Sequence, residues 1–422
     1  MSGVTPEVRT AAGTIEITWR EQRVRAIVSR THSSISGGVS AEVAFQRLRE
    51  DGTTGHLEIC SLNLLSSPTK HSLSRKLDDL CNLEKVGTTW TTLVEQMAVI
   101  ALKKIREGDP IQELSTTLPA APPAYLLEPL LQLGQHTVIF GLGGTGKSYL
   151  AMMLGITVAL PYADNKLGLW PGEIPRRVLY LDWETSYDAL QWRLHKIAAG
   201  MGLPDVKLDY RRCALPLAAD IEAIASAVIK TNAKLVIVDS LGPATEGDLN
   251  KPEAALDLFR ALRQLGNDVT SLLIAHTAKG NGPGDPRAEK TIFGSAFFTN
   301  AARKVYELRA DPEAGEDTIQ VAVMDRKSND AARAKPWGLT INFGEETTRF
   351  TRTEVASMGL LSESLSTPQR IAHFLKIHGK SPLEELAEAL GLEKPAISAA
   401  LSVMKRRGQI VKLKDDYAMA VM

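Results

Sequence analysis

The sequence predicts an α/β protein whose central domain is a parallel sheet flanked by helices, preceded by a β-rich domain and followed by a helical one. Three observations lead to this prediction. Residues 14–65 alternate apolar and polar positions between Gly-rich breaks, and residues 125–355 consist of short apolar runs separated by helical segments. Residues 365–422 have mainly helical spacing. A chain of 422 residues is also too long for one ordinary core.

The N-terminal domain, residues 1–114, is expected to combine strands with helices. Ile15 and Ile17 alternate with polar neighbours, as in a strand with one buried face. Helical spacing follows over residues 72–80 and 90–106. No motif in this domain indicates a particular chemistry.

A linker and then the central domain follow. Residues 115–124 read STTLPAAPPA, and three prolines in ten residues predict an extended linker. In residues 125–355 the apolar runs are typical of strands buried on both faces, as in a parallel sheet covered by helices. The candidate strands are residues 136–140, 177–182, 235–239, 271–275, 304–309 and 318–324.

Composition excludes several classes of protein. The chain has 49 basic and 49 acidic residues, so there is no global attraction to nucleic acid and any DNA contact must come from local patches. No apolar run approaches the ~20 residues of a membrane helix, which argues against a membrane role. The first residues lack a secretory signal, so we expect a cytoplasmic protein. The three cysteines form no CxxC pair, which argues against a zinc site.

The strongest motif is GLGGTGKS at residues 141–148, between an apolar strand and a helical segment. It matches GxxxxGK[ST], and its position between strand and helix is the one that a phosphate-binding P-loop requires. Backbone N–H groups and the helix N-terminus would hold the phosphates of ATP, Lys147 would neutralise them, and the Ser148 hydroxyl would bind Mg²⁺. The predicted nucleotide-binding residues are Gly141, Gly143, Gly144, Thr145, Gly146, Lys147, Ser148 and Tyr149.

Carboxylates end two further apolar strands. Asp239 follows LVIV, as in a Walker B strand, and is predicted to help hold Mg²⁺ together with Ser148. Glu184 follows VLYLDW and is the predicted general base for the attacking water, because only one acid ends the Asp239 strand. Alternatively, Glu184 only caps the next helix. Asp182 is expected on the same side of its strand as Glu184.

A polar pair and a Gly/Pro-rich loop follow the next strand. His276 ends the run SLLIA, where a neutral imidazole could sense the γ-phosphate; a hydrogen-bonded core histidine is the alternative. The loop KGNGPGDPRAEK is a candidate DNA contact through Lys279, Arg287 and Lys290, and a plain solvated loop is the alternative.

These motifs together resemble the RecA-type superfamily, and within it the RepA-like hexameric helicases of phages, plasmids and mobile elements, which are related to DnaB. The resemblance covers roughly residues 125–343 and rests on VIFGLGGTGKS, VLYLDWETS, LVIVDSLGPATEGDLN, LLIAHTAKG and FGSAFFTNAARKVYELR in the family's order. It implies a RecA-like fold, ATP and Mg²⁺ as cofactors, a homo-hexameric ring, single- or double-stranded DNA as partner, and other replication proteins as further partners.

In that family, basic residues of a neighbouring subunit reach toward the γ-phosphate. Arg303 resembles the family's arginine finger and Lys327 resembles the basic residue on the following strand, so both are predicted to act in catalysis. Asn329 stands where related chains have a second arginine, so catalysis in trans would depend mainly on Arg303. The alternative for Arg303 is an ordinary surface charge.

The last domain, residues 365–422, resembles a winged helix-turn-helix. Helical spacing surrounds Gly391, and a second helix ends in a basic run. The resemblance implies DNA contacts from Ser398, Lys405, Arg406 and Arg407. Nearby acidic residues weaken this interpretation of DNA binding. The same fold often binds proteins, and this is the alternative.

Together these inferences predict an ATP-hydrolysing, ring-forming DNA motor that acts as a replicative-type helicase of a phage or mobile element. Two alternatives stay open. One is a DNA-binding regulatory or helicase-loading ATPase without processive unwinding, and the other is a RecA-like recombination mediator.

Overall fold

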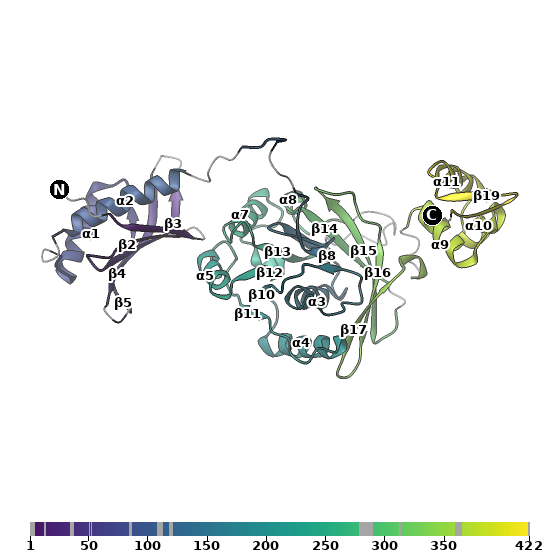
Figure 1. Cartoon of the computed structure of the whole chain (residues 1–422), viewed down its shortest axis with the longest axis horizontal. Helices are drawn as coiled ribbons and strands as arrows, with labels where there is room; N and C mark the ends of the chain where they lie inside the picture. The colour runs from purple at the N-terminus through teal and green to yellow at the C-terminus, as the bar shows by residue number, and fades with distance from the viewer. Residues whose placement is uncertain are drawn as a thin grey trace. The chain divides into compact units, whose positions relative to one another are not determined.

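The structure is a computed structural model that describes residues 5–11, 14–33, 38–49, 51, 53–83, 87–107, 113–117, 121–277, 290–311, 314–358 and 365–420. Most residues before Pro123 belong to one compact unit and most later residues to a second (Figure 1). No helix within these ranges is long and apolar enough to cross a membrane.

The first unit contains a five-stranded antiparallel sheet in which neighbours in sequence are neighbours in space. Its strands are β1 (Glu7–Ala11), β2 (Thr14–Trp19), β3 (Val24–Ser33), β4 (Val39–Leu48) and β5 (Thr54–Asn63). Helices α1 (Ser67–Leu80) and α2 (Trp90–Glu107) share one core with one face of this sheet. Phe45 and Trp90 are fully buried there, with ring centroids 5.5 Å apart in an edge-to-face arrangement. The predicted alternation therefore reflects one covered face and one polar face.

The second unit is built around a nine-stranded sheet in the order β11-β10-β12-β13-β8-β14-β15-β16-β17. Its strands are β8 (His136–Gly141), β10 (Arg177–Asp182), β11 (Asp209–Arg212), β12 (Ala233–Asp239), β13 (Thr270–His276), β14 (Lys304–Ala310), β15 (Thr318–Ser328), β16 (Trp337–Phe343) and β17 (Thr348–Thr353). All six predicted strands are present, and β11, β16 and β17 are additional.

The prediction of a parallel sheet is correct only for part of this sheet. From β11 to β14 all neighbours are parallel, but β14 to β17 pair antiparallel, so the sheet is mixed. The physical reason is connection length: four to eight residues join these last strands, whereas a crossover between parallel neighbours needs about a dozen or more.

Helix α3 (Lys147–Ala159) packs against the middle of the sheet and is buried along almost its whole length. It lacks a polar face because elements surround it on all sides (Figure 1). The other helices of the unit are α4 (Tyr187–Met201), α5 (Ile221–Thr231), α6 (Leu241–Ala244), α7 (Pro252–Arg263), α8 (Ala296–Ala301) and the 3-10 helix η2 (Val355–Ser357). A small sheet in the order β7-β6-β9 joins β6 (Tyr125–Glu128), β7 (Leu131–Gln132) and β9 (Trp170–Pro171).

The C-terminal residues form three helices and a three-stranded sheet. These are α9 (Thr367–His378), β18 (Ser381–Pro382), α10 (Leu383–Leu390), α11 (Lys394–Arg406), β19 (Ile410–Leu413) and β20 (Asp416–Met419). Leu386, Ile397 and Leu401 lie in their shared core. Gly391 ends α10 with a φ of 61°, a left-handed conformation that glycine adopts without steric cost.

Candidate active site

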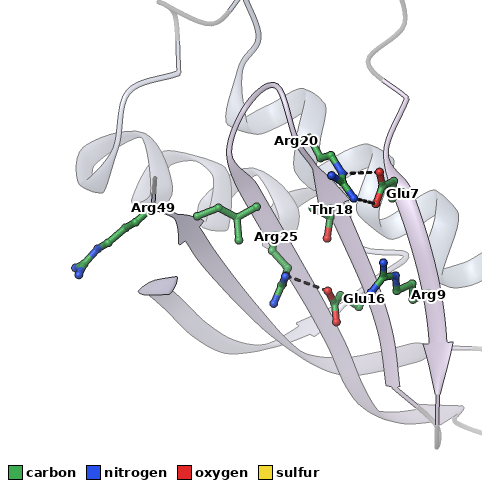
Figure 2. A pocket seen from close by; sticks show the side chains of 8 residues that line it. Glu7, Arg9, Glu16, Thr18, Arg20, Arg25 and Arg49 are labelled. Carbon is green, nitrogen blue, oxygen red and sulfur yellow. Dashed lines mark hydrogen bonds and ion pairs between the residues drawn. The ribbon is translucent and has the colours of Figure 1, made fainter. Parts of the chain in front are cut away.

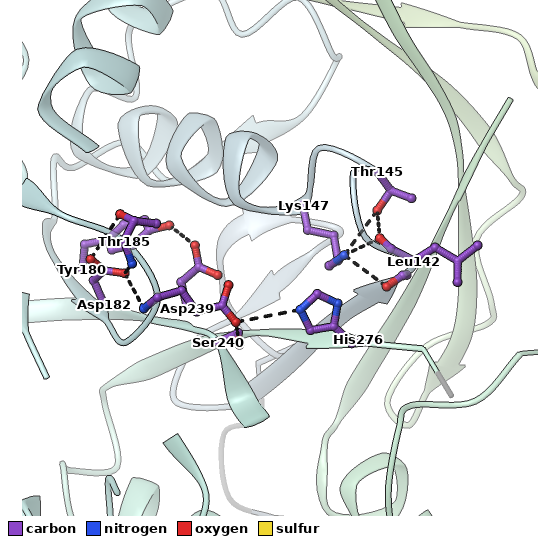
Figure 3. A network of polar contacts seen from close by, with 11 residues as sticks. Leu142, Thr145, Lys147, Tyr180, Asp182, Thr185, Asp239, Ser240 and His276 are labelled. Atoms are coloured by element: carbon purple, nitrogen blue, oxygen red, sulfur yellow. Dashed lines mark hydrogen bonds and ion pairs between the residues drawn. The ribbon is translucent and has the colours of Figure 1, made fainter. Parts of the chain in front are cut away.

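The parallel strands bring four of the predicted site elements to one edge of the nine-stranded sheet. The P-loop follows β8, Glu184 follows β10, Asp239 ends β12 and His276 ends β13. Because these four strands are parallel, their carboxyl ends meet at the same edge, where ligands bind in open α/β sheets. Figure 3 shows Lys147, Asp239, Ser240 and His276 gathered there.

The loop itself positions Lys147 as a buried cation. Gly144 and Gly146 have φ values of 76° and 73°, which a residue with a side chain rarely adopts. The Lys147 ammonium donates to the carbonyl oxygens of Gly141 (3.1 Å) and Leu142 (2.6 Å). Burial lowers its pKa to about 8, although Asp239 and Glu184 act in the opposite direction. A buried ammonium held by carbonyls has little negative charge to balance it, which fits a site for a polyanion such as a triphosphate.

Asp239 is an acid whose buried oxygen lacks a partner. Its side chain is almost fully buried, and one oxygen, Oδ2, accepts a hydrogen bond from the Tyr180 hydroxyl. The other, Oδ1, has no hydrogen bond of normal geometry among the described residues, although the nearby Ser148 hydroxyl helps to stabilise the ionised form. Burial is the main cause of the raised pKa of Asp239. An unpartnered buried carboxylate oxygen beside a hydroxyl fits a hard cation such as Mg²⁺, since oxygen ligands are what this ion prefers.

Glu184 is half-exposed and is held by its neighbours in space. The Ser240 hydroxyl donates to Glu184 Oε1, and His276 Nε2 lies 3.8 Å from the same oxygen. His276 is itself about half exposed, so it is not a core histidine. Helix α4 is capped by Ser186, which accepts a hydrogen bond from the Ala189 N–H. Glu184 is therefore not the cap of this helix.

Asp182 is expected on the same side of its strand as Glu184, but the two side chains have different surroundings. It is fully buried, and its Oδ1 accepts the backbone N–H groups of Glu184 (3.1 Å) and Thr185 (3.0 Å). Its Oδ2 accepts the hydroxyl of Tyr210 at 3.2 Å. Asp182 thus fixes the turn that carries Glu184, because the chain leaves the strand at this point and the alternation ends.

Arg303 and Lys327 lie at the opposite edge of the sheet. Arg303 immediately precedes β14, and its N–H donates to the carbonyl of His136, the first residue of β8. The P-loop begins at the other end of β8, roughly 16 Å away at about 3.3 Å per residue. The Arg303 side chain is exposed and has no ion-pair partner among the described residues. It cannot reach the phosphate loop of its own chain.

Lys327 has a different environment from Arg303. Its ammonium donates to the carbonyls of Thr299 (3.0 Å), Asn300 (2.7 Å) and Ala302 (2.7 Å), at the C-terminal end of α8. Burial and the neighbouring Arg303 lower its pKa. All three N–H donors are therefore engaged in holding α8, a positioning role that the sequence did not indicate.

Arg193 is a further residue near the site that no sequence motif marked. Its guanidinium lies over the ring of Tyr149, 4.4 Å from the centroid, and its Nε and Nη1 are buried without hydrogen-bond partners in the described structure. Its charge helps to stabilise ionised Asp239. The Tyr149 ring also meets Phe343 edge-to-face, with centroids 5.0 Å apart. Tyr149, predicted to bind nucleotide, is thus packed between α4 and β16.

The predicted DNA contacts fall into three groups. Lys279 and Arg287 lie outside the described residues. Lys290 is described and exposed. In the C-terminal residues Ser398 is exposed on α11, and the exposed cations Lys405, Arg406 and Arg407 follow at its end.

One protein-family model matches the part of the chain that carries this site. A family model described as an AAA domain matches residues 109–282, which include the P-loop, Glu184, Asp239 and His276. This region is a P-loop ATPase-type domain. Arg303 and Lys327 lie beyond the matched residues.

Among solved structures, a KaiC-like protein from the hyperthermophilic archaeon Pyrococcus horikoshii is similar at 17% identity and a TM-score of 0.37, over 57% of this chain and 99% of that chain. No curated protein matches the sequence.

Proposed function

We propose that this chain is an ATP-hydrolysing DNA motor that assembles as a homo-hexameric ring, and that it acts as a replicative-type helicase of a phage or mobile element. One observation carries the proposal. Among the described residues, the P-loop edge of the sheet collects the loop lysine and the acids, and the guanidinium of nearby Arg193 lies over the Tyr149 ring, whereas an exposed arginine, Arg303, lies at the opposite edge. Two such edges complement each other when one subunit follows the next around a ring.

Within one site, each group has a separate role. Lys147 and the loop N–H groups bind the β- and γ-phosphates, and Ser148 with Asp239 would hold Mg²⁺. The bound ion would neutralise charge on the phosphate oxygens. Glu184, held by Ser240, orients and deprotonates the attacking water. Arg303 of the next subunit stabilises the negative charge of the transition state.

The DNA contacts are proposed on different grounds. The basic end of α11 supplies exposed charge that can bind phosphates, and the order of helices and strands after Thr367 supports a winged helix-turn-helix. In this proposal the ring encloses one strand and the C-terminal domain contacts duplex DNA.

A DNA-binding regulatory or helicase-loading ATPase is the second candidate, and the surface of α10 favours it. Glu384 and Glu385 are exposed in the first turn of this helix, where they would repel a DNA backbone and suit a protein partner. In that case nucleotide would control assembly without processive unwinding. A RecA-like recombination mediator is a third possibility with a distinct assembly, an open filament.

Imaging and unwinding separate these functions. We expect closed rings in negative stain when the protein is mixed with a non-hydrolysable ATP analogue and single-stranded DNA, and ATP-dependent opening of a forked duplex. Rings that never open the duplex would favour the loading ATPase, and open filaments would favour the recombination mediator. Monomers under all conditions would contradict a shared active site.

A further inference from the structure

The face of the N-terminal sheet that α1 and α2 leave uncovered carries a cluster of arginines. A hollow of about 300 Å³ on this face is lined by Arg9, Arg20, Arg25 and Arg49 together with Glu7 and Glu16 (Figure 2). We call these six residues the arginine pocket. Four cations and two anions leave a local surplus of two positive charges in a chain whose net charge is zero.

Two of these arginines form ion pairs with the acids of the pocket. Arg20 is ion-paired with Glu7, and its Nη2 donates to Oε2 at 2.9 Å. Arg25 Nε lies 3.0 Å from Glu16 Oε1. Arg9 and Arg49 have no ion pair among the described residues and lie on either side of the paired groups (Figure 2). Arg9 is opposite Glu16 in the strand pairing, and its charge helps to lower the pKa of Glu7. The surplus of two positive charges therefore belongs to the arginine pocket as a whole.

The distance between these two arginines points to a polymer. Arg9 is on β1 and Arg49 directly follows β4, which is the third strand beyond β1 in the sheet. In the strand register Arg9 is in the row of Glu16, Ile27 and Ala44, and Arg49 lies five residues beyond Ala44. At about 4.8 Å per strand and 3.3 Å per residue, the two positions are roughly 14 Å apart across the sheet and about 16 Å apart along the strands. One phosphate cannot contact both guanidinium groups, but successive phosphates of a nucleic acid strand can.

An apolar strip lies beside the arginine pocket. Strand pairing places Ile27 of β3 opposite Ala44 of β4, and Ala44 opposite Ile59 of β5. In the same cross-strand row, Glu16 of the pocket is opposite Ile27. Ile59 is 54% exposed and lies at the end of this row. The face thus offers cations for phosphates and, next to them, apolar surface for unstacked bases.

We propose that this face binds single-stranded DNA, with the backbone crossing the sheet between Arg9 and Arg49 and bases lying against Ile27 and Ile59. A single strand fits better than a duplex because the bases of a duplex are stacked inside it and cannot reach the strip. The inference rests on the proposed DNA motor for the choice of DNA as the polyanion. It adds a second contact with the single strand, outside the ATPase domain.

Direct binding measurements with the full chain test this proposal. The variant is Arg9→Ser/Arg49→Ser, and the probe is a fluorescent oligo-dT of about 20 nucleotides, titrated without nucleotide at several salt concentrations. We expect binding to weaken by on the order of 10-fold or more. The slope of log K against log salt should decrease by about 1.4, which corresponds to two lost phosphate contacts.

A matched control carries the same loss of charge on the other side of the domain. Arg75→Ser/Arg106→Ser removes two exposed arginines from α1 and α2, and it should bind the oligonucleotide like the unmodified protein. A second variant, Ile59→Ser, should weaken oligo-dT binding while leaving the salt slope unchanged, because it removes apolar contact and no charge. Basal ATPase activity without DNA should be the same in all these variants.

The outcomes separate this inference from the proposed motor. Loss of oligonucleotide binding in the pocket variant alone supports the inference, even if the protein never opens a duplex. Equal binding by the pocket variant and the control overturns it, whether or not the protein unwinds DNA. It is also overturned if inorganic phosphate at low millimolar concentration displaces the oligonucleotide, because then the pocket binds small anions, or if the unmodified chain does not bind oligo-dT.

Discussion

The two edges of the nine-stranded sheet differ in how their charged groups are partnered. At the carboxyl ends of the parallel strands, each charged group is hydrogen-bonded to a neutral group of the same chain: Lys147 to loop carbonyls, Asp239 to Tyr180, and Glu184 to Ser240. At the other edge Arg303 is exposed and unpaired among the described residues, and it adds to the positive charge that, after burial, lowers the pKa of His136 to about 4.

This difference indicates which kind of binding partner each edge of the sheet suits. The first edge is preorganised within one chain, as a binding site for a small molecule should be. The second has a charge that finds no partner in the described part of its own chain, which suits a contact with another molecule. The following predictions test this division of labour, from the largest expected effect to the smallest.

Removal of the loop lysine should have the largest effect. Lys147→Ala should reduce ATP hydrolysis to background and greatly weaken nucleotide binding, because the triphosphate loses its main charge partner. The fold should survive, since the change removes a buried cation. Turnover and the binding of a fluorescent ATP analogue are the measurements, with exposed Lys230→Ala as the control. Near-normal turnover would rule out a P-loop mechanism.

Removal of Arg303 should separate binding from turnover. Arg303→Ala should bind ATP almost normally, because the residue is far from its own loop, and turnover should fall by roughly 10³-fold. Exposed Arg349→Ala is a matched control. A mixture of Arg303→Ala with Lys147→Ala should regain some activity, because some interfaces combine an intact loop with an intact Arg303. Co-assembled mixtures that remain inactive would contradict sites shared between subunits.

Replacement of Glu184 should have a smaller effect on turnover. Glu184→Gln keeps the shape of the side chain but removes the base, so ATP binding should persist while turnover falls by on the order of 10²-fold. Asp182→Asn is the comparison, and it should lower thermal stability because it weakens the turn that holds Glu184 and Thr185. If Asp182→Asn alone abolished turnover without loss of stability, the two acids would have exchanged roles.

The pH dependence of ATP binding should show the smallest effect. In the free protein, burial lowers the Lys147 pKa to about 8, whereas bound phosphates favour the charged form and raise it. Affinity should therefore be full below pH 8 and should weaken by up to about tenfold per pH unit above it. Titrations at constant ionic strength measure this. Lys147→Arg should show no such dependence in this window, because arginine stays charged.

The sequence was sufficient for the parts of the site that are local in the chain. The P-loop motif, the strand that ends at Asp239 and the segment around Glu184 each occupy a few consecutive residues, and the structure places all three at the carboxyl ends of the parallel strands. Local pattern also identified all six strands that it proposed, because buried strands are continuous apolar runs.

The parts that the sequence missed depend on pairings between distant residues. Tyr180 donates to Asp239 and Ser240 to Glu184 across 59 and 56 positions, and no local pattern marks such partners. The three carbonyl partners of Lys327 depend on where α8 ends in space. The antiparallel strands β16 and β17 were missed as well, since the pattern alone did not mark where the sheet changes direction.

Strand β8 joins the two edges directly. Its last residue, Gly141, opens the phosphate loop, and its first, His136, accepts the backbone N–H of Arg303. All six of its residues are buried between strands β13 and β14, so the strand can shift only as a unit. In the proposed ring, a displacement of the loop when ATP binds or leaves would move the arginine that serves the next site. One short strand would then act as a mechanical coupling that times hydrolysis in one subunit by the nucleotide state of its neighbour.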